Sequence, residues 1–130
     1  MRTTELFHDL GARLGVSGLV PNEANACAVR MEGEIQVEIQ HDAGAERVAL
    51  CATVMSLSDH DRPAVQRQAL AANLRPREMQ GMHFALHPDR PELLLCVSVG
   101  TSDAASLRVQ EAIGRLVAAC RQWQLRLQPA

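Results

Sequence analysis

The sequence contains five histidines and four cysteines, the residue types that most often bind metal ions or act as nucleophiles. Their spacing matches no known zinc motif, because there is no C-x-x-C, no H-E-x-x-H and no closely spaced cysteine and histidine pair. His83 and His87 are four residues apart in a segment with strand character, which separates them by roughly 13 Å. That distance is too long for two ligands of one ion. The spacing therefore predicts surface histidines rather than metal ligands.

A catalytic cysteine would need a base held beside it by the fold, and the sequence alone places no histidine there. All four cysteines fall in segments with strand or helix character, where free thiols usually pack as small apolar groups: Cys27, Cys51, Cys96 and Cys120. His60 is the histidine with acidic residues close on both sides, and helix capping explains those acids equally well. We therefore predict no enzymatic activity, no metal and no cofactor, with a cysteine or metal enzyme kept as an alternative.

The composition fits one soluble domain, residues 1–130. Apolar residues make up 47% and charged residues 22% of the chain, which is ordinary for a globular protein. The 13 basic residues are all arginines scattered among 15 acidic ones, whereas nucleic-acid binding needs clustered positive charge. No apolar run approaches the roughly 20 residues of a membrane helix, and the first residues lack a signal-peptide core. We expect a cytoplasmic protein with reduced cysteines, no nucleic-acid partner and no membrane insertion.

Alternation of apolar and polar residues predicts three strands in the first half of the chain, at residues 27–32, 34–40 and 47–54. In the middle strand Ile35, Val37 and Ile39 face one way and polar residues face the other, as in an antiparallel strand with one solvated face. Short links at residues 32–33 and 42–45 can form the turns. The three strands should form an antiparallel meander.

Helical periodicity predicts three helices, at residues 4–14, within residues 56–74, and at residues 104–127. Gly15 can end the first helix in a left-handed conformation. Asp59 or Asp61 can cap the second helix, with Pro63 in its first turn, and Ser102 or Asp103 can cap the third. A methionine-bearing loop follows the second helix, and strands at 82–87 and 92–99 lie between that loop and the third helix. We therefore predict an α+β domain in the order helix, three strands, helix, two strands, helix, with an antiparallel sheet and the helices packed to one side.

The second helix has two apolar sides. Val65, Ala69 and Ala72 fall together on the helical wheel, and Leu70 and Leu74 fall nearly opposite. This pattern indicates a helix that packs on its own sheet with one side and on something else with the other.

Four segments carry a resemblance to a known family: LFHDLGARLG near the start, LAANL in the second helix, FALHPDRPELLLCVSV across the later strands, and AIGRLVAACRQWQLRL in the last helix. Together with the order of elements, they make nearly the whole chain similar to the class I type III secretion chaperones, the Tir chaperone family. The chain differs from many members in its mild acidity, its lack of tyrosine and its two phenylalanines.

The resemblance implies a cytoplasmic homodimer without enzymatic activity that binds the N-terminal chaperone-binding segment of a secreted effector protein. Such a protein keeps this segment extended and export-competent and assists its delivery to the secretion apparatus. A small regulatory or sensory domain of the same fold, without an effector client, is the alternative.

The resemblance also places the dimer contact on the second helix and the strand that follows it. An alanine-lined helix side agrees with this, because it lets two helices approach closely across a two-fold axis. The residues expected at the dimer interface are Val65, Ala69, Ala72 and Met82. Methionine suits cores as well as adaptable surfaces, so Met79 and Met82 could instead fill the interior.

For the effector, the resemblance implies apolar patches near the first helix and the sheet, with an added strand on an exposed sheet edge in some members. Backbone hydrogen bonds would then supply general affinity, and pockets for alternate side chains would supply selectivity. The residues expected to bind the effector are Leu6, Phe7, Leu10, Val29, Ile35 and Val37. The same residues would form the core of any α+β domain, and that alternative stays open.

Overall fold

The computed structural model describes residues 2–32 and 34–128, so Gly33, part of the predicted first turn, lies outside the described residues. The elements follow in the order α1 (Thr3–Leu14), β1 (Ala26–Met31), β2 (Ile35–Asp42), β3 (Arg47–Ser56), α2 (Arg62–Asn73), α3 (Pro76–Met79), β4 (His83–Leu86), β5 (Glu92–Gly100) and α4 (Ala105–Arg126). Apart from the short helix α3, this is the predicted order.

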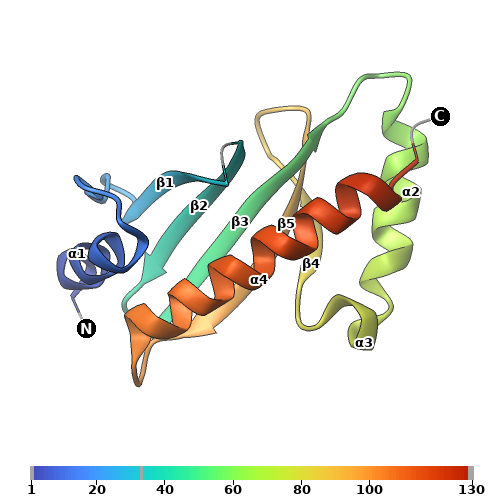
Figure 1. Ribbon diagram of the computed structural model, residues 1–130. Helices are drawn as coiled ribbons and strands as arrows, with labels where there is room; N and C mark the ends of the chain where they lie inside the picture. Colours follow the sequence, from blue (N-terminus) through green and yellow to red (C-terminus); the bar gives the residue numbers. More distant parts are fainter. Residues whose placement is uncertain (1, 33, 129–130) are drawn as a thin grey trace.

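The five strands form one antiparallel sheet in the order β1-β2-β3-β5-β4. The first three strands form the predicted meander, and β5 returns beside β3 with β4 on its outer side. Figure 1 shows α4 crossing one face of the sheet, α1 beside its first half and α2 beside β4. The fold confirms the predicted α+β class, with the helices on one side.

Alternation along the strands explains why the helices cover one face. In β2 the buried residues Ile35, Val37 and Ile39 alternate with more exposed polar ones, as expected for a strand with one wet side. The buried stripe of α4, including Val109 and Ile113, packs against this apolar face. One core therefore lies between the sheet and the helices, and none of the helices in residues 2–32 and 34–128 covers the opposite face of the sheet (Figure 1).

Two predicted turn signals are confirmed. Gly15 follows α1 with a φ of 70°, the left-handed conformation that glycine tolerates best. Between β2 and β3, the Asp42 carboxylate accepts a hydrogen bond from the backbone N–H of Ala45 at 3.0 Å. Aspartate at the start of a turn commonly does this.

The predicted helix caps are wrong in detail. Residue 104, an alanine, precedes α4 in a left-handed conformation with no side-chain cap, in place of Ser102 or Asp103. Asp61 precedes α2 but makes no cap hydrogen bond, and the Ser58 hydroxyl instead accepts the Asp61 N–H at 3.1 Å. The turn of helix at α3 lies in a segment that we expected to be a loop, because Pro76 can open a helix but its four residues are too few for a periodic signal.

Candidate partner-binding surfaces

The outer edge of β4 is closed by the last residue of α2. The Asn73 side chain accepts a hydrogen bond from the Phe84 N–H at 2.7 Å and donates one to the Phe84 carbonyl at 3.1 Å. An amide side chain thus takes the place of a neighbouring strand at the middle of β4. Such protection is one way in which proteins prevent further strands from pairing with a sheet edge.

The outer edge of β1 is closed only at its beginning. The Ala26 carbonyl accepts the Asn22 N–H at 2.8 Å, and the Ala26 N–H donates to the Asn22 side chain at 3.1 Å, so both backbone groups of Ala26 point away from β2. Backbone groups alternate in direction along an antiparallel strand. Ala28 and Arg30 therefore present their N–H and C=O groups to the same open side, where another extended chain could pair with them.

A groove lies beside α1, lined in part by the loop that precedes β1. It has a volume of about 490 Å³ and lies between α1 and the following loop, with Phe7, Leu19 and Val20 among its lining residues. Val20 is 72% exposed, so a partner chain could contact it at the rim of the groove. The loop approaches so closely that a Cβ on Gly11 would lie 2.8 Å from the Val16 carbonyl oxygen.

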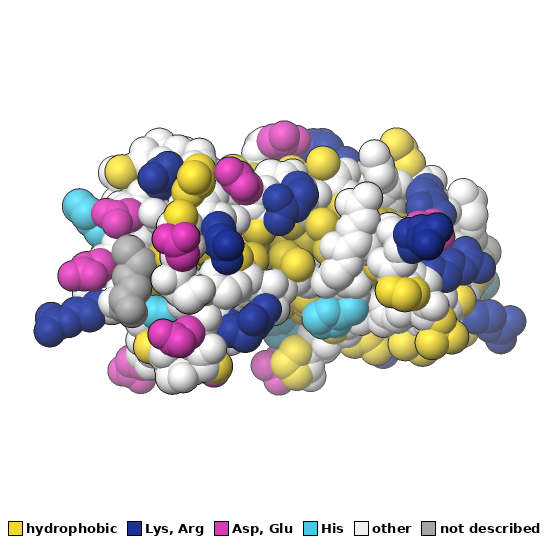
Figure 2. All heavy atoms as spheres, turned by 90° about the horizontal axis from the view of Figure 1, so that it is seen from below, with side chains coloured by type: hydrophobic (Ala, Val, Ile, Leu, Met, Phe, Trp, Pro, Cys, Tyr) yellow, Lys and Arg dark blue, Asp and Glu magenta, His cyan; other side chains and the backbone are white. Residues whose placement is uncertain are grey.

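The second apolar surface lies at the opposite end of the sheet. Leu70 and Leu74 on α2 are 66% and 83% exposed, and Leu86 at the end of β4 is 50% exposed. A groove of about 240 Å³ lies between α2 and β4, and its lining is apolar except for one glutamine: Gln66, Ala69, Leu70, Phe84, Ala85, Leu86 and Leu93. Figure 2 shows hydrophobic side chains gathered toward the right-hand end, where α2, α3 and β4 lie. We call this the α2/β4 surface.

The end of α4 holds the α2/β4 surface in place. The Trp123 and Phe84 rings meet edge to face with their centroids 5.0 Å apart, an arrangement that stabilises aromatic pairs. Arg126 lies 4.1 Å above the Trp123 ring and forms an ion pair with Glu78 on α3. The hydrogen bond from Arg126 lowers the pKa of the Glu78 carboxyl.

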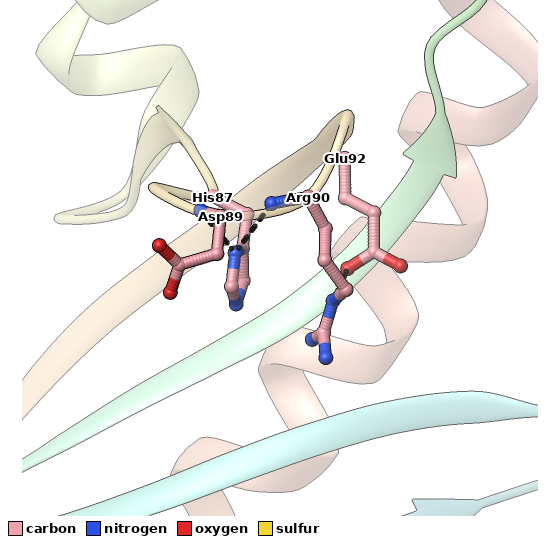
Figure 3. Close-up of polar contacts among 4 residues, drawn as sticks. All are labelled: His87, Asp89, Arg90 and Glu92. Carbon is pink, nitrogen blue, oxygen red and sulfur yellow. Dashed lines mark hydrogen bonds and ion pairs between the residues drawn. The ribbon is translucent and has the colours of Figure 1, made fainter.

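The histidines do not converge on a site. His87 turns into the loop between β4 and β5, where its Nδ1 accepts the backbone N–H groups of Asp89 at 3.0 Å and Arg90 at 3.1 Å (Figure 3). His83 stands on the exposed face of β4. His83 is exposed on the strand, and His87 stabilises the turn.

One histidine is buried. The His41 ring lies 2.9 Å from the Thr3 hydroxyl, which links the end of β2 to the start of α1. Burial lowers the pKa of this histidine. Within residues 2–32 and 34–128, no group of three or more histidine, cysteine or acidic side chains could hold a metal ion.

All ten residues expected at partner contacts have buried side chains in the protomer: Leu6, Phe7, Leu10, Val29, Ile35, Val37, Val65, Ala69, Ala72 and Met82. They form part of one core cluster. Three of them also line a groove: Phe7 beside α1, Ala69 beside β4, and Ile35 between the start of β2 and the end of β3. These ten side chains do not form open apolar patches, because the sheet and helices of one protomer already cover them. Their contact with a partner stays a prediction.

The exposed leucines of α2 were visible in the sequence, but the dimer contact was predicted on the opposite, alanine-rich side of the helix. The helical wheel placed Leu70 and Leu74 opposite Val65, yet periodicity cannot tell which apolar side of a helix faces its own sheet. The buried side proved to be the alanine-rich one. Asn73 and the open backbone of β1 gave no sequence signal, because neither depends on side-chain periodicity.

The molecule thus combines an antiparallel sheet covered by helices on one face, an open backbone edge at β1, a groove beside α1 and an apolar surface at the far end, features suited to contacts with other polypeptides. The chain belongs to the Tir chaperone protein (CesT) family, whose model matches residues 5–124. No curated protein matches the sequence.

Solved structures share the fold. A chain in the crystal structure of the ExsC-ExsE complex superposes with a TM-score of 0.79 at 19% identity, covering 97% of this chain and 92% of that one. A chain in the complex of the Yersinia pestis type III secretion chaperone SycH with a fragment of YscM2 gives 0.67 at 16% identity, covering 98% and 100%. A chain in the ExoT-SpcS complex from Pseudomonas aeruginosa gives 0.62 at 15% identity, covering 90% and 92%. At these identities the likeness concerns the fold. In the described part of this chain, no helix is long and apolar enough to cross a membrane.

Proposed function

We propose that this protein is a type III secretion chaperone that binds the N-terminal segment of an effector protein and keeps it extended for export. Family membership supports the general role, and the structural neighbours include chaperone-effector complexes. The observation that carries the proposal is the open edge of β1, where Ala28 and Arg30 offer backbone groups to another extended chain.

The groove and the edge are continuous along the chain, since the groove includes residues 16–21 and β1 begins at Ala26. An extended client could pair with β1 through its backbone and place an apolar side chain against Val20. Backbone pairing supplies affinity without sequence preference, and the groove adds selectivity. The buried residues Leu6, Phe7, Leu10, Val29, Ile35 and Val37 would then support this site from beneath.

The α2/β4 surface is the proposed homodimer contact. Its edge strand is closed by Asn73, so strand addition is blocked there and side chains must supply the contact. Exposed leucines around an apolar groove suit a second apolar surface, and a two-fold axis would bury the same patch twice. In this arrangement Leu70, Leu74 and Leu86 make the contact, with Val65, Ala69, Ala72 and Met82 packed behind them.

The proposed chaperone acts in the cytoplasm before export, without catalysis or a cofactor, and passes its client to the secretion apparatus. Co-expression with the N-terminal segment of an effector encoded beside this gene tests the role. We expect a soluble complex that co-purifies. If no neighbouring or co-regulated effector segment co-purifies, the result would favour the alternative, a regulatory or sensory domain of the same fold without an effector client.

Two surface variants separate the proposed sites. Val20→Glu should weaken client binding and leave the protein dimeric, whereas Leu70→Glu with Leu74→Glu should give a monomer. Leu107→Glu, on the exposed side of α4, is the control that should change neither property. Loss of client and dimer together in every variant would show that the two surfaces are not separate.

A further inference from the structure

Cys51 and Cys96 lie directly opposite each other on the neighbouring strands β3 and β5. Their sequence neighbours Leu50 and Leu95 are fully buried on the helix-covered face. Because successive side chains in a strand point to opposite faces, both thiols project from the other face of the sheet. None of the described helices covers that face, as the ribbon in Figure 1 shows.

Paired residues on antiparallel strands are either hydrogen-bonded to each other or not, and the backbone hydrogen bonds between β3 and β5 show which applies to Cys51 and Cys96. The Thr101 N–H donates to the Glu46 carbonyl at 2.9 Å, so these two residues form a hydrogen-bonded pair. Hydrogen-bonded and non-hydrogen-bonded pairs alternate along antiparallel strands. Five steps along an unbroken register, Cys51 and Cys96 form a non-hydrogen-bonded pair.

The pairing of β5 with β4, on its other side, leads to the same assignment. Phe84 directs its backbone groups outward to Asn73, so His83, one residue earlier, directs its groups inward to Cys96, its partner in the register. Cys96 therefore bonds to β4 rather than to β3. In a non-hydrogen-bonded pair the Cα atoms are about 4.5 Å apart, which lies within the roughly 4.4–6.8 Å range of disulfides.

The two thiols also differ in reactivity. A hydrogen bond with Cys96 lowers the pKa of Cys51, whereas the hydrogen bond with Cys51, together with burial, raises the pKa of Cys96. Burial raises the pKa of Cys27 and of Cys120 to about 11 in each case. Cys51 is also partly exposed, so it is the thiol best placed to attack, since the thiolate is the reactive form.

We propose that Cys51 and Cys96 form a thiol–disulfide exchange site that reacts reversibly with a low-molecular-weight disulfide such as oxidised glutathione. The Cys51 thiolate attacks one sulfur of the small disulfide, breaks its S–S bond and releases one glutathione thiolate. Cys96 then loses its proton, for which the facing His83 imidazole is an acceptor, and its sulfur attacks the Cys51 sulfur and releases the second glutathione. The protein loses two electrons and two protons, and one small disulfide becomes two thiols.

The bond would enclose α2, α3 and β4, the elements of the α2/β4 surface, in one covalent loop between β3 and β5. Closing such a loop restricts the unfolded chain. We therefore expect the oxidised protein to unfold at a higher temperature, by roughly 5 °C or more.

The test incubates the native, reduced protein with oxidised and reduced glutathione at a series of ratios, followed by rapid alkylation and mass spectrometry. The four cysteines fall in different tryptic peptides, because arginines separate them. We expect loss of two free thiols, a disulfide that joins the Cys51 and Cys96 peptides, and full reversal by a reducing agent. Cys51→Ala and Cys96→Ala should each abolish that link, and Cys27→Ala should keep it.

Three results would overturn the proposal. One is a native protein whose four thiols all stay free under oxidising ratios that leave its circular dichroism unchanged. Another is a glutathione adduct that remains on Cys51 without closing to Cys96. The third is a disulfide that joins other cysteines or two chains. Because the peptide map is made on the wild-type chain, poor folding of a variant would not remove the test.

Discussion

The two edges of the sheet are treated differently. At β4 the Asn73 side chain satisfies both backbone groups of Phe84, and the exposed leucines of α2 lie beside it. At β1 the Asn22 contacts end at Ala26 and leave Ala28 and Arg30 open. The difference teaches that one end can recognise only side chains, whereas the other can recognise an extended backbone. A symmetric partner suits the first, and a flexible client of variable sequence suits the second.

The largest expected effect separates the two sides of α2. Ala69→Glu places a carboxylate where the side chain is 2% exposed, so we expect a loss of about 3 kcal/mol or more in the free energy of unfolding. At protein concentrations low enough to keep all chains monomeric, the adjacent Leu70→Glu should change the free energy of unfolding by about 0.5 kcal/mol or less, because that side chain faces solvent in the protomer. Urea denaturation of both variants measures the difference. Equal losses would contradict the orientation of α2.

The next effect concerns the closed edge. Asn73→Ala removes two hydrogen bonds from Phe84 and opens β4, so we expect a loss of about 1–3 kcal/mol and a greater tendency to aggregate. Asn22→Ala, at the other edge, loses contacts that are largely exposed and should cost about 1 kcal/mol or less. Thermal unfolding with light scattering compares the pair. A larger loss at Asn22 would reverse the comparison.

A proline tests the open edge directly. Ala28→Pro removes an N–H that points away from β2, a place where edge strands tolerate proline, so the fold should persist while client affinity falls by about tenfold. Ala28→Val keeps the N–H and should bind normally. Titration calorimetry with the client segment gives the affinities. Unchanged binding by the proline variant would mean that the client does not pair with β1.

The smallest effect is a dependence on pH at the β1 end. Folding lowers the pKa of His41 by burial, so the unfolded chain binds its proton more readily. The contribution of His41 to stability is complete above its ordinary pKa of about 6.5 and declines as the pH falls from there toward the folded value. Denaturation midpoints between pH 7.5 and 5.5 should decrease in the wild type and change less in His41→Asn. If the midpoint changes equally with pH in both proteins, groups other than His41 cause the pH dependence.

The sequence predicted the fold well because its strands and helices follow their periods closely. Ile35, Val37 and Ile39 mark the covered face of β2, and the stripe of α4 marks the helix that covers it. The partner surfaces were harder to predict, because buried and exposed apolar residues look alike in a sequence. Val65 and Leu74 are equally apolar, and only packing decides that the first is buried and the second is 83% exposed. Backbone availability at Ala28 and the opposed thiols of Cys51 and Cys96 depend on strand register, which periodicity alone does not fix.

The central claim is that one end of the molecule binds a second copy and the other binds an extended client. Light scattering of the purified protein, free and with a co-expressed client segment, tests it most directly. We predict twice the 14.2 kDa chain mass for the free protein and the same dimer with client mass added in the complex. A free protein at the mass of a single chain, unchanged by the client segment, would contradict the account.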